Sequence, residues 1–252
     1  MENYVSILGI SKKYQTKNGE VTALDNIDLQ VAEGEIVSIV GQSGCGKSTL
    51  LSIVAGLLIP TAGKITVEGE EVRGTDEKIG YMMQKDNLLE WRTILDNVLF
   101  GLEIRKKVTE ESIAYARHLL GEYGLGDFKK SYPSELSGGM RQRAALIRTL
   151  AVRPKLLLLD EAFSALDYQT RLLVTDDVRE ILRKEKMTTL MVTHDIPESI
   201  SMADRIAVLS ARPGRVKSLH TLDFGEDLTA IARRAHPRFQ MYFNRIWGEL
   251  NG

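Results

Sequence analysis

The 252-residue sequence contains a single cysteine, Cys45, so no internal disulfide can form. A disulfide-based fold is therefore excluded, and a reducing compartment is the simpler expectation. No run approaches the roughly 18 to 20 apolar residues that cross a bilayer, and the longest, residues 50–59, is interrupted by Ser52 and Gly56. The start, Met1 to Tyr4, lacks the basic and apolar segments of a secretory signal. We expect a chain that does not span a membrane by itself.

The sequence also lacks an excess of either charge. It has 33 basic and 34 acidic residues, which gives a formal net charge of −1. Proteins that coat nucleic acid or anionic lipid carry a marked basic surplus, so we expect no nucleic-acid partner. Hydrophobic residues make up 43% and charged residues 27%. These values are typical of a globular protein with a substantial core.

Five segments have strand-like patterns. Residues 27–31 and 64–68 alternate apolar and polar positions, which predicts strands with one solvated face. Residues 36–40, 156–159 and 190–192 are short continuous apolar runs, typical of parallel strands buried on both faces. The two patterns together predict an antiparallel portion beside a parallel sheet.

Segments with helical spacing of apolar residues alternate with these strands. They are residues 47–58, 109–123, 137–151 and 168–184. Such alternation predicts an α/β fold, here a single domain over residues 1–224. Because residues 85–153 show no strand pattern, we expect them to form a helical insertion. Residues 225–252 predict a helical appendage interrupted by Pro237, with Ile231, Phe239, Phe243, Ile246 and Trp247 packed on the body.

Residues 41–49, GQSGCGKST, match the phosphate-loop pattern G-x-x-x-x-G-K-[ST] and follow a buried strand. Glycines let the backbone wrap anionic oxygens, and the helix N-terminus adds partial positive charge. Lys47 is expected to bind the terminal phosphates and Ser48 to ligate Mg²⁺. Cys45 fills a variable position, and the alternative for the whole segment is a glycine-rich turn. The expected nucleotide-binding residues are Gly41, Gln42, Ser43, Gly44, Cys45, Gly46, Lys47, Ser48 and Thr49.

The segment LLLLDE, residues 156–161, predicts a buried strand that ends in two carboxylates. An aspartate at this place, Asp160, fits the acid that supports Mg²⁺ in phosphate-loop enzymes. Ligands of α/β sheets lie at the carboxyl ends of strands, so Glu161 is placed to orient or deprotonate an attacking water. Taken alone, the pair is better interpreted as a solvated loop, but the phosphate loop on the same chain favours a catalytic site.

The segment LSGGM, residues 136–140, predicts an unusual helix start. Ser137 is a good N-cap, whereas Gly138 and Gly139 each cost about 1 kcal/mol relative to alanine in a helix interior. The exposed N–H groups form a second candidate anion site, which contains no lysine and would hold a phosphate weakly by itself. A flexible helix start is the alternative interpretation.

In their order along the chain, these three motifs resemble the ATP-binding subunits of ATP-binding cassette (ABC) transporters. The resemblance covers residues 4–220 and implies the phosphate-loop ATPase fold with an antiparallel β subdomain and a helical insertion. It also assigns roles to Tyr14 (stacking on adenine), Gln84 (the Q-loop), residues 164–167 (the D-loop) and His194 (the switch histidine).

Within the family, the sequence is most similar to importers of nitrate, sulfonate, taurine and related small solutes. Residues 87–98, 165–171 and 211–215 carry this similarity. Met140, where many transporters have glutamine, is usual in this branch. Ala162 and Glu90 stand where many relatives have proline, and neither position supplies a ligand.

The resemblance implies that two copies face each other, with each ATP between one phosphate loop and the partner's Ser137, Gly138 and Gly139. Lys47, Glu161 and His194 would be catalytic, with Glu161 polarising the water and His194 at the γ-phosphate. The residues that would serve Mg²⁺ are Ser48, Gln84 and Asp160.

The resemblance further implies a separate multi-span permease and, indirectly, a solute-binding protein. The chain would then be cytoplasmic and peripheral on the inner face of the membrane. Trp91 is a candidate contact with the permease, and buried packing is the alternative. Other functions considered are import of another small organic solute, a small-molecule kinase, an exporter and a non-transport ABC ATPase. The kinase gives no reason for the LSGGM segment, and the last two usually carry further domains on the same chain.

Overall fold

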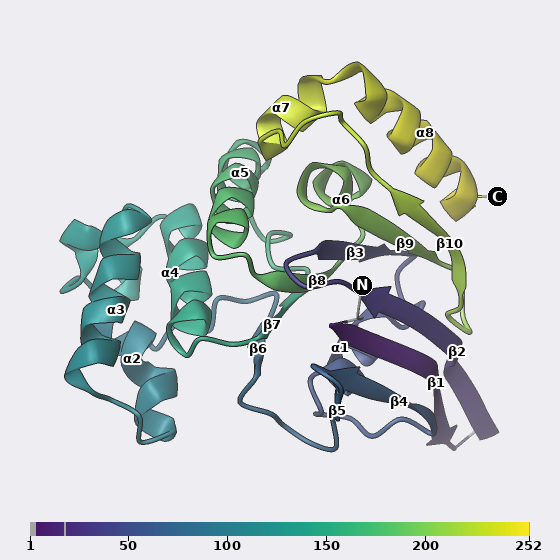
Figure 1. The fold of residues 1–252 in the computed structure, drawn as a ribbon, viewed down its shortest axis with the longest axis horizontal. Coiled ribbons are helices and arrows are strands. Elements are labelled where there is room, and N and C mark those ends of the chain that lie inside the picture. The colour runs from purple at the N-terminus through teal and green to yellow at the C-terminus, as the bar shows by residue number, and fades with distance from the viewer. Residues whose placement is uncertain (1–3, 18, 252) are drawn as a thin grey trace.

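The computed structural model describes residues 4–17 and 19–251, so Met1 to Asn3 of the expected signal-free start lie outside it. Two sheets form the centre of the molecule (Figure 1). The smaller is a four-stranded antiparallel sheet in the order β2-β1-β4-β5. Its strands are β1 (Val5–Thr16), β2 (Gly19–Val31), β4 (Ala62–Val67) and β5 (Glu70–Glu71).

The larger sheet has six strands in the order β10-β9-β3-β8-β7-β6, and only the edge strand β10 is antiparallel to its neighbour. The strands are β3 (Ile36–Val40), β6 (Ile79–Met82), β7 (Leu156–Asp160), β8 (Thr188–Thr193), β9 (Arg205–Leu209) and β10 (Val216–Thr221). The predicted apolar runs are its central strands β3, β7 and β8. This arrangement confirms the predicted α/β fold with an antiparallel β subdomain.

The central strands β3, β7 and β8 are mostly apolar because each face meets a different hydrophobic layer, and polar exceptions such as Ser38 of β3 and the threonines of β8 are buried with them. On β3, Val37 and Ile39 pack toward the antiparallel sheet and α1 (Lys47–Val54). Ile36 and Val40 pack on the opposite side, in the core shared with the other helices. Two cores thus meet at one sheet, and the carboxyl ends of its strands lie at one edge.

Helices cover the two sides of the large sheet unequally. Figure 1 shows α1 between the sheets, with α5 (Tyr168–Lys184), α6 (Ile196–Met202) and α8 (Pro237–Asn251) on the far side. Helix α1 is shorter than the predicted 47–58 because Gly56 has φ 70°, where a Cβ would lie 1.8 Å from the carbonyl oxygen of Gly74. Among the described residues, no helix has the length and apolar character needed to span a bilayer.

Between β6 and β7 the chain forms helices only. These are α2 (Ile94–Ile104), α3 (Glu110–Glu122), two single 3₁₀ turns and α4 (Gly138–Ala151). The caps agree with the sequence signals, since the side chains of Thr93, Thr109 and Ser137 each accept a backbone N–H. Figure 1 shows these helices as a body beside the sheet, which places the LSGG segment away from α1.

The C-terminal segment forms α7 (Ala230–Ala235) and α8, and Pro237 begins α8. Proline at the first helical position is favourable because its missing N–H would be unpaired there anyway. Ile246 is fully buried, and Phe239 and Phe243 pack partly on the core. The prediction that Ile231 and Trp247 pack on the body is wrong, since they are 44% and 55% exposed. They lie on the outer side of short amphipathic helices, which apolar spacing alone does not reveal.

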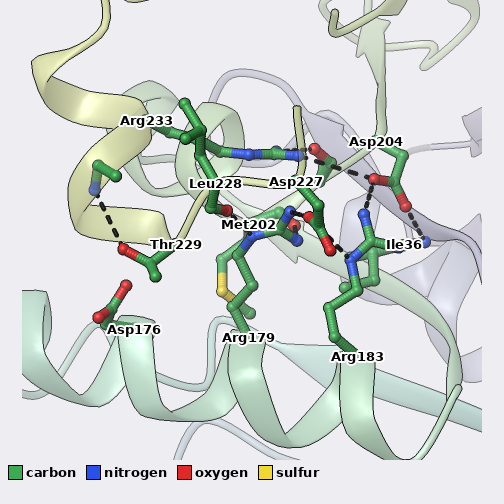
Figure 2. Close-up of polar contacts among 12 residues, drawn as sticks. Ile36, Asp176, Arg179, Arg183, Met202, Asp204, Asp227, Leu228, Thr229 and Arg233 are labelled. Atoms are coloured by element: carbon green, nitrogen blue, oxygen red, sulfur yellow. Dashed lines mark hydrogen bonds and ion pairs between the residues drawn. The ribbon is translucent and has the colours of Figure 1, made fainter. Parts of the chain in front are cut away.

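A group of arginines joins this appendage to the core (Figure 2). Arg179 of α5 donates to the carbonyls of Met202 and Leu228, at 3.2 and 3.1 Å, and forms an ion pair with Asp227 at 2.6 Å. From the other side, Arg233 of α7 reaches the end of α6. The buried arginines thus satisfy backbone carbonyls that no helix or sheet pairs.

Arg233 is 4% exposed, donates to the carbonyls of Ile200 and Ala203, and lies 4.8 Å from the ring centroid of Phe224. Burial lowers the pKa of Arg233 to about 10, so the guanidinium stays charged at neutral pH. Asp204 lies 3.8 Å from it and accepts the N–H of Ile36, the first residue of β3. The appendage is therefore connected to the central sheet through one carboxylate.

We expect Arg233→Ala to lower the free energy of unfolding by about 2–4 kcal/mol, because it leaves buried carbonyls unpaired and a cavity beside Phe224. Urea denaturation measures this loss. The matched control is Arg238→Ala, whose ion pair with Asp223 is at the surface and should matter much less. Equal losses in the two variants would contradict the anchoring role of Arg233.

Candidate active site

The phosphate loop connects β3 to α1. Gly44 and Gly46 have φ values of 75° and 111°, a conformation that residues with a Cβ rarely adopt. Lys47 is 5% exposed, and its Nζ donates to the carbonyls of Gly41 and Gln42 at 2.8 and 3.2 Å. The ammonium of Lys47 is therefore held within the phosphate loop, where it could bind anionic oxygens.

A pocket of about 670 Å³ opens beside this loop, which is within the size range of small-ligand sites. It is lined by Tyr14, Thr16, Val21, Ala23, Ser43, Gly44, Gly46, Lys47, Ser48, Thr49, Glu161, His194 and Arg212. One wall comes from the antiparallel sheet, and the other from the carboxyl ends of strands in the large sheet. The pocket thus brings together most of the residues that the sequence predicts for the site.

Each carboxylate oxygen of Asp160 accepts a hydrogen bond from a hydroxyl group. Ser48 Oγ donates to Oδ1 at 3.0 Å, and the phenol of Tyr81 donates to Oδ2 at 2.8 Å. Burial, together with the nearby carboxylate, raises the pKa of the Tyr81 phenol, so Tyr81 remains a donor. Tyr81 was not among the predicted site residues, although it lies on β6, next to β7.

The chemistry of this donor set fits Mg²⁺. Magnesium takes hard oxygen ligands and is commonly bound by one or two protein groups together with substrate phosphates. The hydroxyl of Ser48 and the carboxylate of Asp160 provide this number of oxygen donors beside the phosphate loop. Among the described residues, no group of three or more His, Cys, Asp or Glu side chains could hold a metal ion.

Glu161 and His194 contact each other inside the pocket. Glu161 follows β7 with φ 47°, and its N–H donates to the carbonyl of Val192 at 3.0 Å. A left-handed conformation costs a residue with a Cβ of order 1–3 kcal/mol and is concentrated at functional sites. Here it accompanies a carboxylate on the pocket wall, with Oε2 3.2 Å from His194 Nδ1. A carboxylate and an imidazole within hydrogen-bond distance of each other thus line the pocket together.

Tyr14 contributes an aromatic wall. Its ring is 38% exposed and lines the pocket with Val21 and Ala23, both on β2. A partly exposed aromatic beside small apolar residues suits a flat base, which binds by stacking. Tyr14 therefore lines the same pocket as the phosphate loop.

Some predicted residues do not line the pocket: Gly41, Gln42, Cys45, Gln84, Ser137, Gly138, Gly139 and Asp160. Gln84 donates to Ser164 Oγ at 3.0 Å, and Ser164 in turn donates to the carbonyl of Glu161 at 2.9 Å. Gln84 is thus connected to Glu161 through the D-loop rather than placed at Asp160. Ser137 and Gly138 are exposed at the start of α4, and the part of the chain that the structure describes supplies no phosphate-binding lysine there.

Two arginines of α4 hold the segment after Gln84. Arg141 forms ion pairs with Asp86 at 2.9 Å and Glu90 at 2.7 Å, and Arg148 donates to backbone carbonyls of the same segment. Trp91, which follows directly, is 75% exposed, so the alternative of buried packing is wrong. The segment that precedes this exposed tryptophan is thus bound to α4, the helix that begins at the LSGG segment.

Known proteins are similar to this chain in sequence and in fold. A family model described as ABC transporter matches residues 24–164. The chain is 46% identical over 252 residues to YtlC of Bacillus subtilis, an uncharacterized ABC transporter ATP-binding protein, and the match covers 99% of this chain and 96% of YtlC. It is 39% identical over 254 residues to the nitrate import ATP-binding protein NrtD of Synechocystis sp., covering 99% of this chain and 96% of NrtD.

The taurine import ATP-binding protein TauB of Jannaschia sp. is 40% identical over 250 residues, covering 98% of this chain and 93% of TauB. Among solved structures, the ATP-binding cassette MJ0796, a dimer in a post-hydrolysis state bound to ADP and Pi, superposes with a TM-score of 0.73. It is 31% identical, and the match covers 87% of this chain and 99% of that one. These similarities confirm the resemblance drawn from the motifs: the chain belongs to the ABC transporter family, as its ATP-binding and ATP-hydrolysing cassette.

Proposed function

We propose that this cassette energises the import of a small solute, of the nitrate, sulfonate or taurine class, through a separate membrane permease. The observation that carries the ATPase part is the pocket in which Lys47, Ser48, Glu161 and His194 meet. Support for the solute class comes from NrtD and TauB, relatives at about 40% identity that are named for nitrate and taurine import.

Within the site, each residue has a role that follows from its contacts. Lys47 supplies a full positive charge to the terminal phosphates. Ser48 and Asp160 hold Mg²⁺, which when bound neutralises charge on the phosphate oxygens. Glu161 accepts a hydrogen bond from the attacking water, and His194 orients Glu161 and approaches the γ-phosphate. Because phosphoryl transfer depends mainly on positioning and charge stabilisation, these residues supply this chain's share of the chemistry of hydrolysis.

The site is completed by a second copy of the chain. The N-terminus of α4, where Ser137 and Gly138 are exposed and Gly139 is buried, presents backbone N–H groups, and a helix start of this kind binds anions. MJ0796 forms a dimer, which supports the same assembly here. Gln84 would be a further oxygen ligand for Mg²⁺ in the assembled site if its hydrogen bond to Ser164 opened.

The permease binds near the exposed Trp91, and the chain lies on the cytoplasmic face of the membrane through this contact. Arg141 and Arg148 connect that surface to α4, whose first turn faces the partner's nucleotide. Movement imposed on α4 by ATP would therefore reach the permease through the segment 86–91. A solute-binding protein acts only indirectly, by delivering the solute to the permease.

Uptake in cells tests the solute assignment. We expect a strain that lacks this subunit to lose uptake of one of nitrate, taurine or an alkanesulfonate, and to recover it with the wild-type gene. A strain complemented with Glu161→Gln is the matched control and should stay deficient, because import requires hydrolysis. Normal uptake of all three solutes, together with lost uptake of a different solute, would overturn the proposed solute class. The ATPase assignment would remain intact.

A further inference from the structure

The hairpin between β9 and β10, residues 210–215, packs its main chain against the phosphate loop. The N–H of Gly214 donates to the carbonyl of Ala23 at 2.9 Å, and the N–H of Asp25 donates back to Gly214 at 3.0 Å. A Cβ at Gly214 would lie 2.3 Å from the carbonyl oxygen of Cys45, so only glycine allows this approach. The hairpin is therefore fixed to both β2 and the phosphate loop.

This contact brings one arginine to the nucleotide pocket. Nε and Nη2 of Arg212 donate to the carbonyl of Gly44 at 3.3 and 3.1 Å, and Arg212 lines the same pocket as Lys47 and Glu161. Within the described residues, Arg212 has no carboxylate partner. Arg215, three positions later in the same hairpin, pairs instead with Asp25. Arg212 thus differs from its neighbour in carrying an uncompensated charge beside the phosphate loop.

We propose that Arg212 is a positioning residue for the polyphosphate of the nucleotide. It fixes Gly44 in the phosphate loop and adds a second positive charge to that of Lys47. Electrostatic attraction grows with the charge of the ligand, so Arg212 favours nucleoside triphosphates and diphosphates over monophosphates and nucleosides. The inference rests on the proposed ATP-binding function and assigns it a residue outside the familiar motifs.

Ligand affinities of four proteins test this role: the wild type, Arg212→Gln, Arg212→Lys and the control Arg215→Gln. Displacement of a fluorescent ADP analogue by ATPγS, ADP, AMP and adenosine measures each affinity. We expect Arg212→Gln to lower the affinity for ATPγS about tenfold. The affinity for ADP should fall less, and the affinity for adenosine by no more than about twofold. Arg212→Lys should recover most of the ATPγS affinity, since it restores the charge. Arg215→Gln should match the wild type.

Ionic strength provides a second measurement. An exposed charge is screened by salt, so the difference between wild type and Arg212→Gln should shrink when KCl rises from about 0.05 M to about 0.5 M. An equal loss of affinity for ATPγS and for adenosine would overturn the inference. It would show that the substitution changes the shape of the loop and not its attraction for phosphate. No weakening at all would overturn it too. Failure of the wild type to bind any nucleotide would instead contradict the proposed function.

Discussion

Replacing Lys47 with alanine is expected to lower the affinity for ATP by about 100-fold, because it removes the charge that the phosphate loop presents to the terminal phosphates. In the structure this ammonium is buried and donates to two loop carbonyls, which fix its charge within the phosphate loop. Calorimetric titration with ATP measures the loss.

The control for this prediction is Lys64→Ala, which removes an exposed lysine from β4, outside the pocket. It should bind ATP as the wild type does. Thermal unfolding of Lys47→Ala, followed by circular dichroism, establishes that the variant is folded before its affinity is compared. ATP binding by folded Lys47→Ala at wild-type strength would contradict the assignment of the phosphate loop.

Glu161→Gln is expected to slow ATP hydrolysis by about 10²–10³-fold while leaving ATP affinity nearly unchanged. The substitution keeps the shape of the side chain but removes the negative charge that polarises water. Because ATP then stays intact between two copies, we expect a persistent ATP-dependent dimer. Phosphate release measures the first effect, and gel filtration in saturating ATP and Mg²⁺ measures the second.

Two controls separate this effect from a general one. ADP should give no dimer of Glu161→Gln, since it lacks the γ-phosphate that the partner's helix contacts. Glu111→Gln, at an exposed position on α3, should hydrolyse ATP at the wild-type rate. The catalytic assignment fails if Glu161→Gln releases phosphate normally, and the shared-site assignment fails if it binds ATP yet elutes only as a monomer.

Much of the fold could be predicted from local patterns. The strands β3, β7 and β8 are rich in apolar residues because both faces of the sheet are covered, which favours apolar side chains at most positions. Helix α5 has the predicted bounds 168–184, since Asp167 caps its start and apolar spacing continues to its last turn. Such signals involve residues a few positions apart, so a sequence contains them directly.

Contacts between distant segments could not be predicted in the same way. The hydroxyl of Tyr81 reaches Asp160 because β6 and β7 are neighbours, and strand order is not written in either segment. Arg212 meets Gly44, 168 positions away, because β9 lies next to β3. For the same reason a family motif could identify Gln84 while giving no sign of its contact with Ser164.

The absence of any long apolar run therefore determined less about this protein than its motifs did. By itself the sequence determined the chemical groups: a phosphate loop, two carboxylates, a histidine and a second anion-binding helix start. Only the tertiary structure decided which of them meet, that Glu161 contacts His194 in the pocket while Ser137 to Gly139 stay outside it. The physical reason is that chemical identity belongs to single residues, whereas a site depends on the order of strands whose carboxyl ends share one edge.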